Sequence, residues 1–305
     1  MASVFVFGPL SDSAGKTTVC SALARGLVNE GLNVAAFKPR SGHSLWYQRD
    51  AFLKCEEEGR LFCEDIVKLR EASKSVLPLE VLNPVDALMS PLDSRSFLQQ
   101  NAVGRLYLLQ SSAFSHLAVE RYTLCKESGM DNVLCVNEEA ISSGSTMLDT
   151  NYLLNLERNA SKVISIRSLG EWNRIFGKFG PLAMRTGYQR VSERFNCVVV
   201  EGFNDAVCPE PTLRHDVIIG VAPGVAVFYD VERFYDVLET MSELGKDPAA
   251  LRAEDVAKFL KEAEILTIPP VQRECLRDCD KLSRRLNNLV ATTLHYVHRL
   301  GSSEN

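Results

Sequence analysis

The chain has 305 residues, of which 46% are hydrophobic and 24% charged, the mix of a globular protein that buries its core without disulfide bonds. Its 34 basic and 39 acidic residues leave a net charge of −5, which argues against a nucleic acid as the main partner. No apolar run approaches the roughly 18 residues of a membrane span, and no basic segment precedes the first apolar one. We therefore expect no membrane insertion and no signal peptide.

The cysteines favour a reducing compartment. The chain has nine of them, an odd number, and no two stand in the Cys-x-x-Cys spacing. Such a set indicates reduced thiols rather than a disulfide or zinc framework, so we expect a cytoplasmic protein.

The first forty residues alternate between strand and helix patterns. Residues 3–7 are short, apolar, and rich in β-branched and aromatic side chains, which predicts a buried strand ending at Gly8. Apolar residues then recur at helical spacing from Val19 to Leu27, and Gly31 is a C-cap candidate. Residues 34–37 form a second apolar strand. The pattern predicts an α/β fold that begins with strand, loop, helix and strand.

The loop between the first strand and the helix has the chemistry of a phosphate site. Gly15, Lys16 and Thr17 stand at the helix start, where backbone N–H groups and the positive helix end favour anions. In such loops the lysine reaches the β- and γ-phosphates and the hydroxyl ligates Mg²⁺. Six residues separate Gly8 from Gly15, two more than in the standard pattern. We expect the nucleotide contacts to come from Asp12, Ser13, Ala14, Gly15, Lys16, Thr17 and Thr18.

A second lysine, Lys38, directly follows the second strand. Ligands of open α/β sheets bind at the carboxyl ends of the parallel strands, so the position predicts a lysine that faces the ligand. A solvated lysine at a strand end is the alternative.

Five segments, in chain order, resemble dethiobiotin synthetase and its relatives among the cobyrinic acid amide synthetases. They are the loop before Gly15-Lys16-Thr17, Lys38-Pro39 with Ser41-Gly42, residues 65–69, Asn83-Pro84 with Ser90-Pro91, and residues 198–202. The resemblance covers roughly residues 1–95 and 195–230. It implies a three-layer P-loop NTPase with a mainly parallel sheet and helices on both faces.

The resemblance also implies roles for the matching residues. Lys16 and Lys38 are the expected catalytic residues, beside the γ-phosphate and the acceptor. Thr17, Asp65 and Glu201 are the expected Mg²⁺ ligands. Phosphoryl transfer consists largely of positioning and charge neutralisation, so two lysines and a carboxylate-bound Mg²⁺ are a sufficient set. The structural alternatives are a turn-capping acid for Glu201 and a first-turn helix acid for Asp65.

The resemblance places Ser41 near the acceptor substrate, and Pro269 and Pro270 beside the nucleotide base. Arg40 replaces a small apolar residue of the family and is expected to meet an anionic substrate or phosphate, with a solvated arginine as the alternative. Bulky residues follow Glu201-Gly202 where the family has a small-residue turn. These departures argue against the diamine substrate of dethiobiotin synthesis.

The rest of the chain predicts an insertion and a C-terminal helix on a single domain. We expect the core at about residues 1–95 and 195–272, the insertion at about 95–195, and an amphipathic helix at about 273–300. Residues 95–128 have a broad apolar face that predicts helix. Residues 168–190 combine glycines with arginines, which indicates either a basic flap or an irregular surface segment. The last helix packs on its own domain or forms a homodimer.

The leading hypothesis is an enzyme that uses ATP and Mg²⁺ to phosphorylate a carboxylate or carbamate, whose acyl phosphate an amine then opens to form a C–N bond. No Asn-Lys-x-Asp guanine motif is present, which favours ATP over GTP. A nucleotide-driven switch or maturation ATPase or GTPase is the alternative. Such proteins often carry a lysine four residues before Gly15, where this chain has Ser11. A domain that binds nucleotide without turnover is a third reading.

Overall fold

A computed structural model describes residues 1–10 and 14–302, with the side chains of residues 1–10 and 14–299. The protein is α/β, with two mixed sheets and helices around them. Over the described residues, five strand pairings are parallel and four are antiparallel. The chain divides into two compact units. The first comprises Met1–Pro39, Asp65–Leu82 and Tyr188–Asn305, and the second comprises Arg40–Glu64 and Asn83–Gly187.

The first unit is built on a sheet with six described strands. Their bounds are β1 (Ala2–Phe7), β2 (Val34–Phe37), β8 (Cys197–Glu201), β9 (Val217–Ala222), β10 (Val225–Tyr229) and β11 (Glu262–Thr267). The strand order is β11-β10-β9-β1-β8-β2, and β10 alone runs in the direction opposite to the other five strands. The strands at the centre are buried on both faces, as the continuous apolar runs of β1 and β8 predict.

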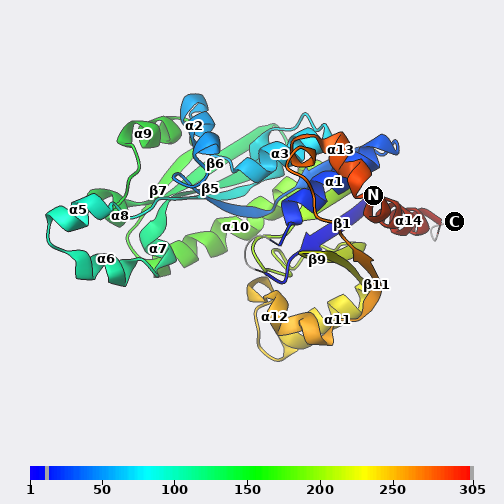
Figure 1. The fold of residues 1–305 in the computed structure, drawn as a ribbon. Coiled ribbons are helices and arrows are strands. Elements are labelled where there is room, and N and C mark those ends of the chain that lie inside the picture. Colours follow the sequence, from blue (N-terminus) through cyan, green and yellow to red (C-terminus); the bar gives the residue numbers. More distant parts are fainter. Residues whose placement is uncertain (11–13, 303–305) are drawn as a thin grey trace. The chain divides into compact units, whose positions relative to one another are not determined.

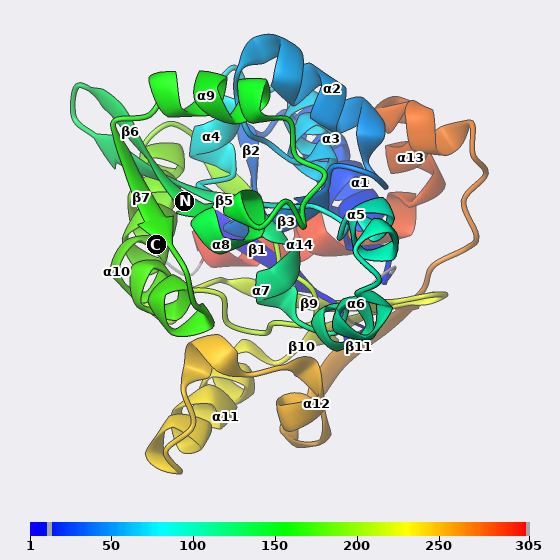
Figure 2. The same cartoon turned by 90° about the vertical axis from the view of Figure 1, so that its left-hand side faces the viewer.

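Helices lie on both sides of this sheet. Figures 1 and 2 show α1 and α13 on one side and α11 and α12 on the other. The helices of this unit are α1 (Lys16–Asn29), α3 (Glu64–Ser73), α4 (Leu79–Leu82), α11 (Val231–Glu243), α12 (Ala253–Val256), α13 (Cys279–Arg285) and α14 (Asn287–Ser302), with 3₁₀ turns at Pro248–Ala250, Ala257–Phe259 and Cys275–Arg277.

The second unit has its own five-stranded sheet within the described residues. The strands are β3 (Arg40–Ser44), β4 (Val85–Met89), β5 (Leu117–Lys126), β6 (Gly129–Asn137) and β7 (Lys162–Ile166), in that order. Its helices are α2 (Arg49–Glu58), α5 (Ser94–Gln99), α6 (Val103–Leu109), α7 (Ala113–His116), α8 (Glu138–Ser142), α9 (Thr150–Arg158) and the long α10 (Leu169–Ser192). Side chains cap several of the short helices, as Asp93 does for α5 and Asp149 for α9.

The core of the second unit lies between its sheet and α10. Phe179, Ala183 and Met184 of α10 pack against buried side chains of β4, β5 and β6. The ring of Phe52 on α2 lies 5.2 Å from that of Tyr152 on α9, and Figure 1 shows these two helices side by side. The unit takes in residues 40–64 and 83–94 in addition to most of the expected insertion.

The structure corrects two expectations in this region. The helix expected over residues 95–128 is wrong beyond His116, because residues 117–126 form β5. That strand is buried on both faces over most of its length, so its apolar pattern does not reveal the strand period. The flap or irregular segment expected at residues 168–190 is instead α10, whose apolar side chains recur at helical spacing on the core face.

The amphipathic helix expected over residues 273–300 is two helices. Asp278 caps the start of α13 through the backbone N–H groups of Asp280 and Lys281. Leu286 then leaves the helical conformation and is buried, and α14 begins at Asn287. The strands expected at residues 3–7, 34–37, 133–136 and 163–166 are confirmed. None of the helices in the described part of the chain is long and apolar enough to cross a membrane.

Candidate functional site

The N-terminus of α1 carries the first part of the candidate site. Gly15 precedes the helix with φ of 90°, a left-handed conformation that glycine adopts without a steric penalty. No side chain within the described residues caps this end of α1, so its first backbone N–H groups can meet an anion. A side chain on Gly8 would begin 2.6 Å from Cβ of Ala14 and 3.3 Å from Nζ of Lys16, so a glycine there lets the strand end approach the helix start.

Four predicted residues of the first unit form one connected cluster. Oγ1 of Thr17 donates to Oε1 of Glu201 over 2.9 Å. Nζ of Lys38 donates to the same Glu201 oxygen over 2.5 Å and to Oδ2 of Asp65 over 2.9 Å. Thr17 comes from the first turn of α1, Lys38 from the end of β2, Asp65 from the start of α3 and Glu201 from the end of β8.

The parallel strands explain why these residues meet. β8 pairs with β1 on one side and β2 on the other, and all three end at the same sheet edge. The loop to α1 follows β1, and Lys38 follows β2 directly. The cluster therefore lies at the carboxyl edge, where open α/β sheets bind their ligands.

The two carboxyl groups of the cluster differ in their electrostatics. Burial raises the pKa of Glu201 above its usual 4.5, against the pull of Lys38, and the Asp65 carboxylate raises it further. Burial acts on Asp65 in the same direction, but the Lys38 ammonium outweighs it and holds the pKa of Asp65 below its usual 3.8. The cluster therefore favours the charged form of Asp65 and disfavours the charged form of Glu201.

One oxygen of the cluster is available to a further ligand. Oε2 of Glu201 is buried and has no hydrogen-bond partner among the described residues. A buried carboxylate oxygen without a partner is costly unless another group binds it. Hydroxyl and carboxylate oxygens are the donors that Mg²⁺ prefers, so Thr17, Asp65 and Glu201 fit this ion.

The protein side chains alone do not make a closed metal site. In the part of the chain that the structure describes, no three His, Cys, Asp or Glu residues are grouped so as to hold a metal. Mg²⁺ that is bound together with a nucleotide generally takes one or two carboxylates along with phosphate oxygens and water, so it does not require such a group.

Sequence reasoning missed Cys20, whose buried thiol lies near this cluster. Burial raises its pKa well above the usual 9.0, and Glu201 adds to the shift. The spacing of four residues from Lys16 places both on one face of α1, a signal available in the sequence. The raised pKa keeps this fully buried thiol neutral, so it is not a nucleophile.

The expected base-binding prolines lie on the same sheet edge as the cluster. β11 runs antiparallel to β10, which runs antiparallel to β9, so β11 ends at the edge where β1 ends. Pro269 and Pro270 follow that end, three strands from β1 in the sheet order. Strands are spaced by about 4.8 Å, so these prolines stand roughly 14 Å along the edge from β1.

The expected substrate residues, Ser41 and Arg40, belong to the second unit, and both contact side chains of that unit. Oγ of Ser41 donates to Oδ1 of Asn83 over 2.9 Å and to Oδ1 of Asp86 over 2.6 Å. The guanidinium of Arg40 lies 3.3 Å from Oε1 of the fully buried Glu120 and 4.1 Å from the ring centre of Phe176. The solvated alternative for Arg40 is therefore wrong.

The other residues expected to contact the nucleotide differ in their exposure, and two of them are not described by the structure. Asp12 and Ser13 lie outside the described residues. Ala14 is buried beside Gly8, and Lys16 is 9% exposed. Thr18, in the first turn of α1, is half-buried.

Sequence reasoning also missed Asp86, the partner of Ser41. It is a buried acid inside the apolar strand β4, a pattern that is visible in the sequence of that strand.

Comparison of the chain with models of known protein families finds no match, and comparison with curated protein sequences finds none either.

Proposed function

We propose that this protein is a three-layer P-loop NTPase that binds Mg²⁺ and ATP and transfers the γ-phosphoryl group to a small acceptor. Its reaction is the activation of a carboxylate or carbamate as an acyl phosphate, which an amine opens to form a C–N bond. The observation that carries the proposal is the double use of Glu201. One oxygen is shared by Thr17 and Lys38, and the other is buried without a described partner.

The residues of the cluster supply what phosphoryl transfer needs. Thr17, Asp65 and Glu201 would hold the metal, which neutralises phosphate charge when bound. Lys16 at the start of α1 and Lys38 at the end of β2 provide two positive charges at one sheet edge. Charges fixed in place before the reaction stabilise the transition state without reorganisation, which is the main source of catalysis in this chemistry.

The test combines nucleotide binding with turnover. We expect Mg²⁺ and ATP together to raise the melting temperature, because a ligand that binds only the folded state stabilises it. Lys16→Ala should abolish most of that shift and of phosphate release, and Lys258→Ala, an exposed lysine of the same unit, should leave both unchanged. The proposal fails if Lys16→Ala turns over ATP at the wild-type rate, or if no nucleotide shifts the melting temperature.

A nucleotide-driven switch that acts on a protein partner is the second candidate. It is favoured by the engagement of Ser41 and Arg40 inside their own unit, which leaves the acceptor without those two contacts. It is also favoured by α6, where Tyr107 and Leu108 are 66% and 78% exposed. Hydrolysis that is slow alone and accelerated only by a protein partner would support this candidate over the synthetase.

A further inference from the structure

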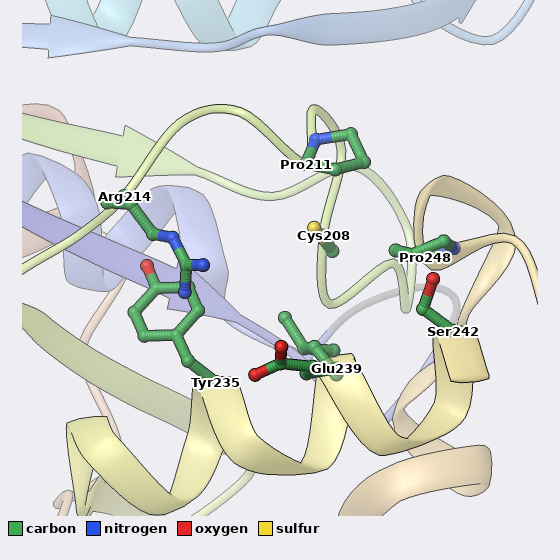
Figure 3. Close-up of a pocket in the computed structure, with 8 residues that line it drawn as sticks. Cys208, Pro211, Arg214, Tyr235, Glu239, Ser242 and Pro248 are labelled. Atoms are coloured by element: carbon green, nitrogen blue, oxygen red, sulfur yellow. The ribbon is translucent and has the colours of Figure 1, made fainter.

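A pocket of the first unit, lined by none of the residues of the Glu201 cluster, lies between α11 and the segment that joins β8 to β9 (Figure 3). Its volume is about 210 Å³. Tyr235, Glu239 and Ser242 project into it from one side of α11, opposite Cys208, Pro211 and Arg214 of the joining segment. The proposed function uses none of these residues.

One end of the pocket has a positive charge held on an aromatic ring. The guanidinium carbon of Arg214 lies 4.1 Å from the ring centre of Tyr235. The hydroxyl of Tyr235 accepts a hydrogen bond of 2.6 Å from the backbone N–H of His215, so the ring is fixed in position. Stacking covers one face of a guanidinium and leaves its N–H donors at the edge for a planar anion such as a carboxylate. Arg214 forms no ion pair with any described residue.

The pocket also carries the opposite charge. Glu239 stands one helical turn after Tyr235 on α11, and the Ser242 hydroxyl follows three residues later. Figure 3 shows the Glu239 carboxylate directed along α11 toward Tyr235, on the side of the pocket where Arg214 lies. Like Arg214, it has no ion-pair partner within the described chain. A carboxylate only accepts hydrogen bonds, so Glu239 suits an ammonium group.

Apolar groups line the rest of the pocket. Leu238 and Cys208 are buried in the pocket wall, and Pro211 and Pro248 complete it. Burial raises the pKa of Cys208 to about 12, so its thiol stays neutral and acts as a small apolar group. The wall thus suits a short aliphatic body.

Hydrogen bonds order the segment that joins β8 to β9. Both the backbone N–H and the hydroxyl of Thr212 donate to Oε1 of Glu210, over 3.2 and 2.8 Å. The backbone N–H of Val207 donates to the carbonyl of Leu251, and that of Ala253 donates to the carbonyl of Asp205. A wall that is already ordered costs little entropy when a ligand binds.

We propose that this pocket binds a free α-amino acid with a small aliphatic side chain. Arg214 takes the carboxylate, Glu239 and Ser242 take the ammonium, and the wall of Leu238, Pro211 and Pro248 takes the side chain. The volume and the pair of opposite charges select a zwitterion over a simple anion or cation. The proposal stands independently of nucleotide binding, because it involves no residue of the Glu201 cluster.

The test is calorimetry on the full chain without nucleotide, using L-alanine, L-valine and L-leucine as probes. We expect at least one of them to bind, and isobutyrate and isobutylamine, which each lack one charge, to bind about tenfold or more weakly. Arg214→Gln and Glu239→Gln should each weaken amino-acid binding by about the same factor. Glu232→Gln, an exposed glutamate of the same helix outside the pocket, should bind like the wild type.

Either of two results overturns the proposal. One is the absence of binding heat for all three amino acids up to about 10 mM. The other is binding that persists unchanged in both Arg214→Gln and Glu239→Gln. Circular dichroism of these surface variants confirms that they fold, so a loss of binding is not a loss of structure.

Discussion

Nζ of Lys38 lies 2.5 Å from Oε1 of Glu201, and the two side chains are only 6% and 1% exposed. Two buried opposite charges in contact compensate each other, whereas a single buried charge is strongly destabilising. The pair is also shared, because Asp65 contacts Lys38 and Thr17 contacts Glu201. Substitutions at either end therefore affect both folding and the candidate site.

Replacing Lys38 with methionine is expected to destabilise the protein at pH 7 by about 3–5 kcal/mol, the usual cost of breaking a buried ion pair from one side. The reason is that Glu201 stays buried beside Asp65 with no cation against it. Urea unfolding of the wild type and of Lys38→Met measures the cost.

The double variant Lys38→Met/Glu201→Gln is the matched control. It removes both charges of the pair, so it should be more stable than Lys38→Met alone. If the two substitutions are instead additive, the pair contributes no coupling energy and the account of this cluster is wrong.

Glu201→Gln alone should change how stability depends on pH. The pKa of Glu201 is raised in the folded protein above the usual 4.5, so the folded state binds the proton more tightly than the unfolded chain. The stability that this proton contributes is fully present below pH 4.5, the usual pKa. It is lost as the pH rises through the raised pKa of the folded protein. Glu201→Gln removes this loss, so the unfolding free energy of the variant relative to that of the wild type should increase from pH 4 to pH 8 in urea unfolding.

The same variant should behave oppositely toward ligand. Because the amide in Glu201→Gln lacks the ionised oxygen that would meet Mg²⁺, the melting-temperature shift given by Mg²⁺ and ATP should shrink in this variant. A variant that shows the expected pH profile and also keeps the full ligand shift would remove Glu201 from the metal site.

Local patterns explain why most of the cluster was predictable. Lys16 and Thr17 follow a glycine at a helix start, and Lys38 and Glu201 each end an apolar strand. Each pattern spans fewer than ten residues and needs only the rule that parallel strands end at one edge. The partner of Ser41 was not predictable in this way, because Asp86 sits inside an apolar strand and its pairing depends on the β3–β4 register.

Two segments of the second unit, β5 and α10, were harder to predict than the cluster. In β5, Ala118 and Val119 point to opposite faces of the sheet and both are inaccessible, so no alternation appears. In α10 the glycines and Pro181 lower the apparent helix propensity, yet Phe179 and Met184 are held by the core. Tertiary packing outweighs local propensity in both segments.

The approach of α1 to α14 gives a further prediction. A methyl group on Gly26 would begin 2.6 Å from Cγ1 and Cγ2 of Val290, so Gly26→Ala forces the two helices apart. Such overpacking costs about 1–3 kcal/mol. Val290→Ala supplies the space that the new methyl group needs, so the double variant should recover part of the stability lost in Gly26→Ala. Equal stabilities of Gly26→Ala and the wild type in urea would contradict this packing.

The buried His215 predicts how the protein responds to acid. The Tyr188 hydroxyl donates to Oγ of Ser3, which lies 2.8 Å from Nδ1 of His215. Burial lowers the pKa of His215 from 6.5 to about 3, so the folded protein favours the neutral ring. The unfolded chain therefore binds this proton first, and stability is lost as the pH falls from 6.5 toward 3, by about 1.4 kcal/mol per pH unit. We expect unfolding free energies measured between pH 7 and pH 4 to show this slope in the wild type. The control variant His295→Asn, which replaces an exposed histidine, should show the same slope. In His215→Asn the slope should be smaller by about 1.4 kcal/mol per pH unit. Parallel profiles for all three proteins would mean that acid acts elsewhere in the fold.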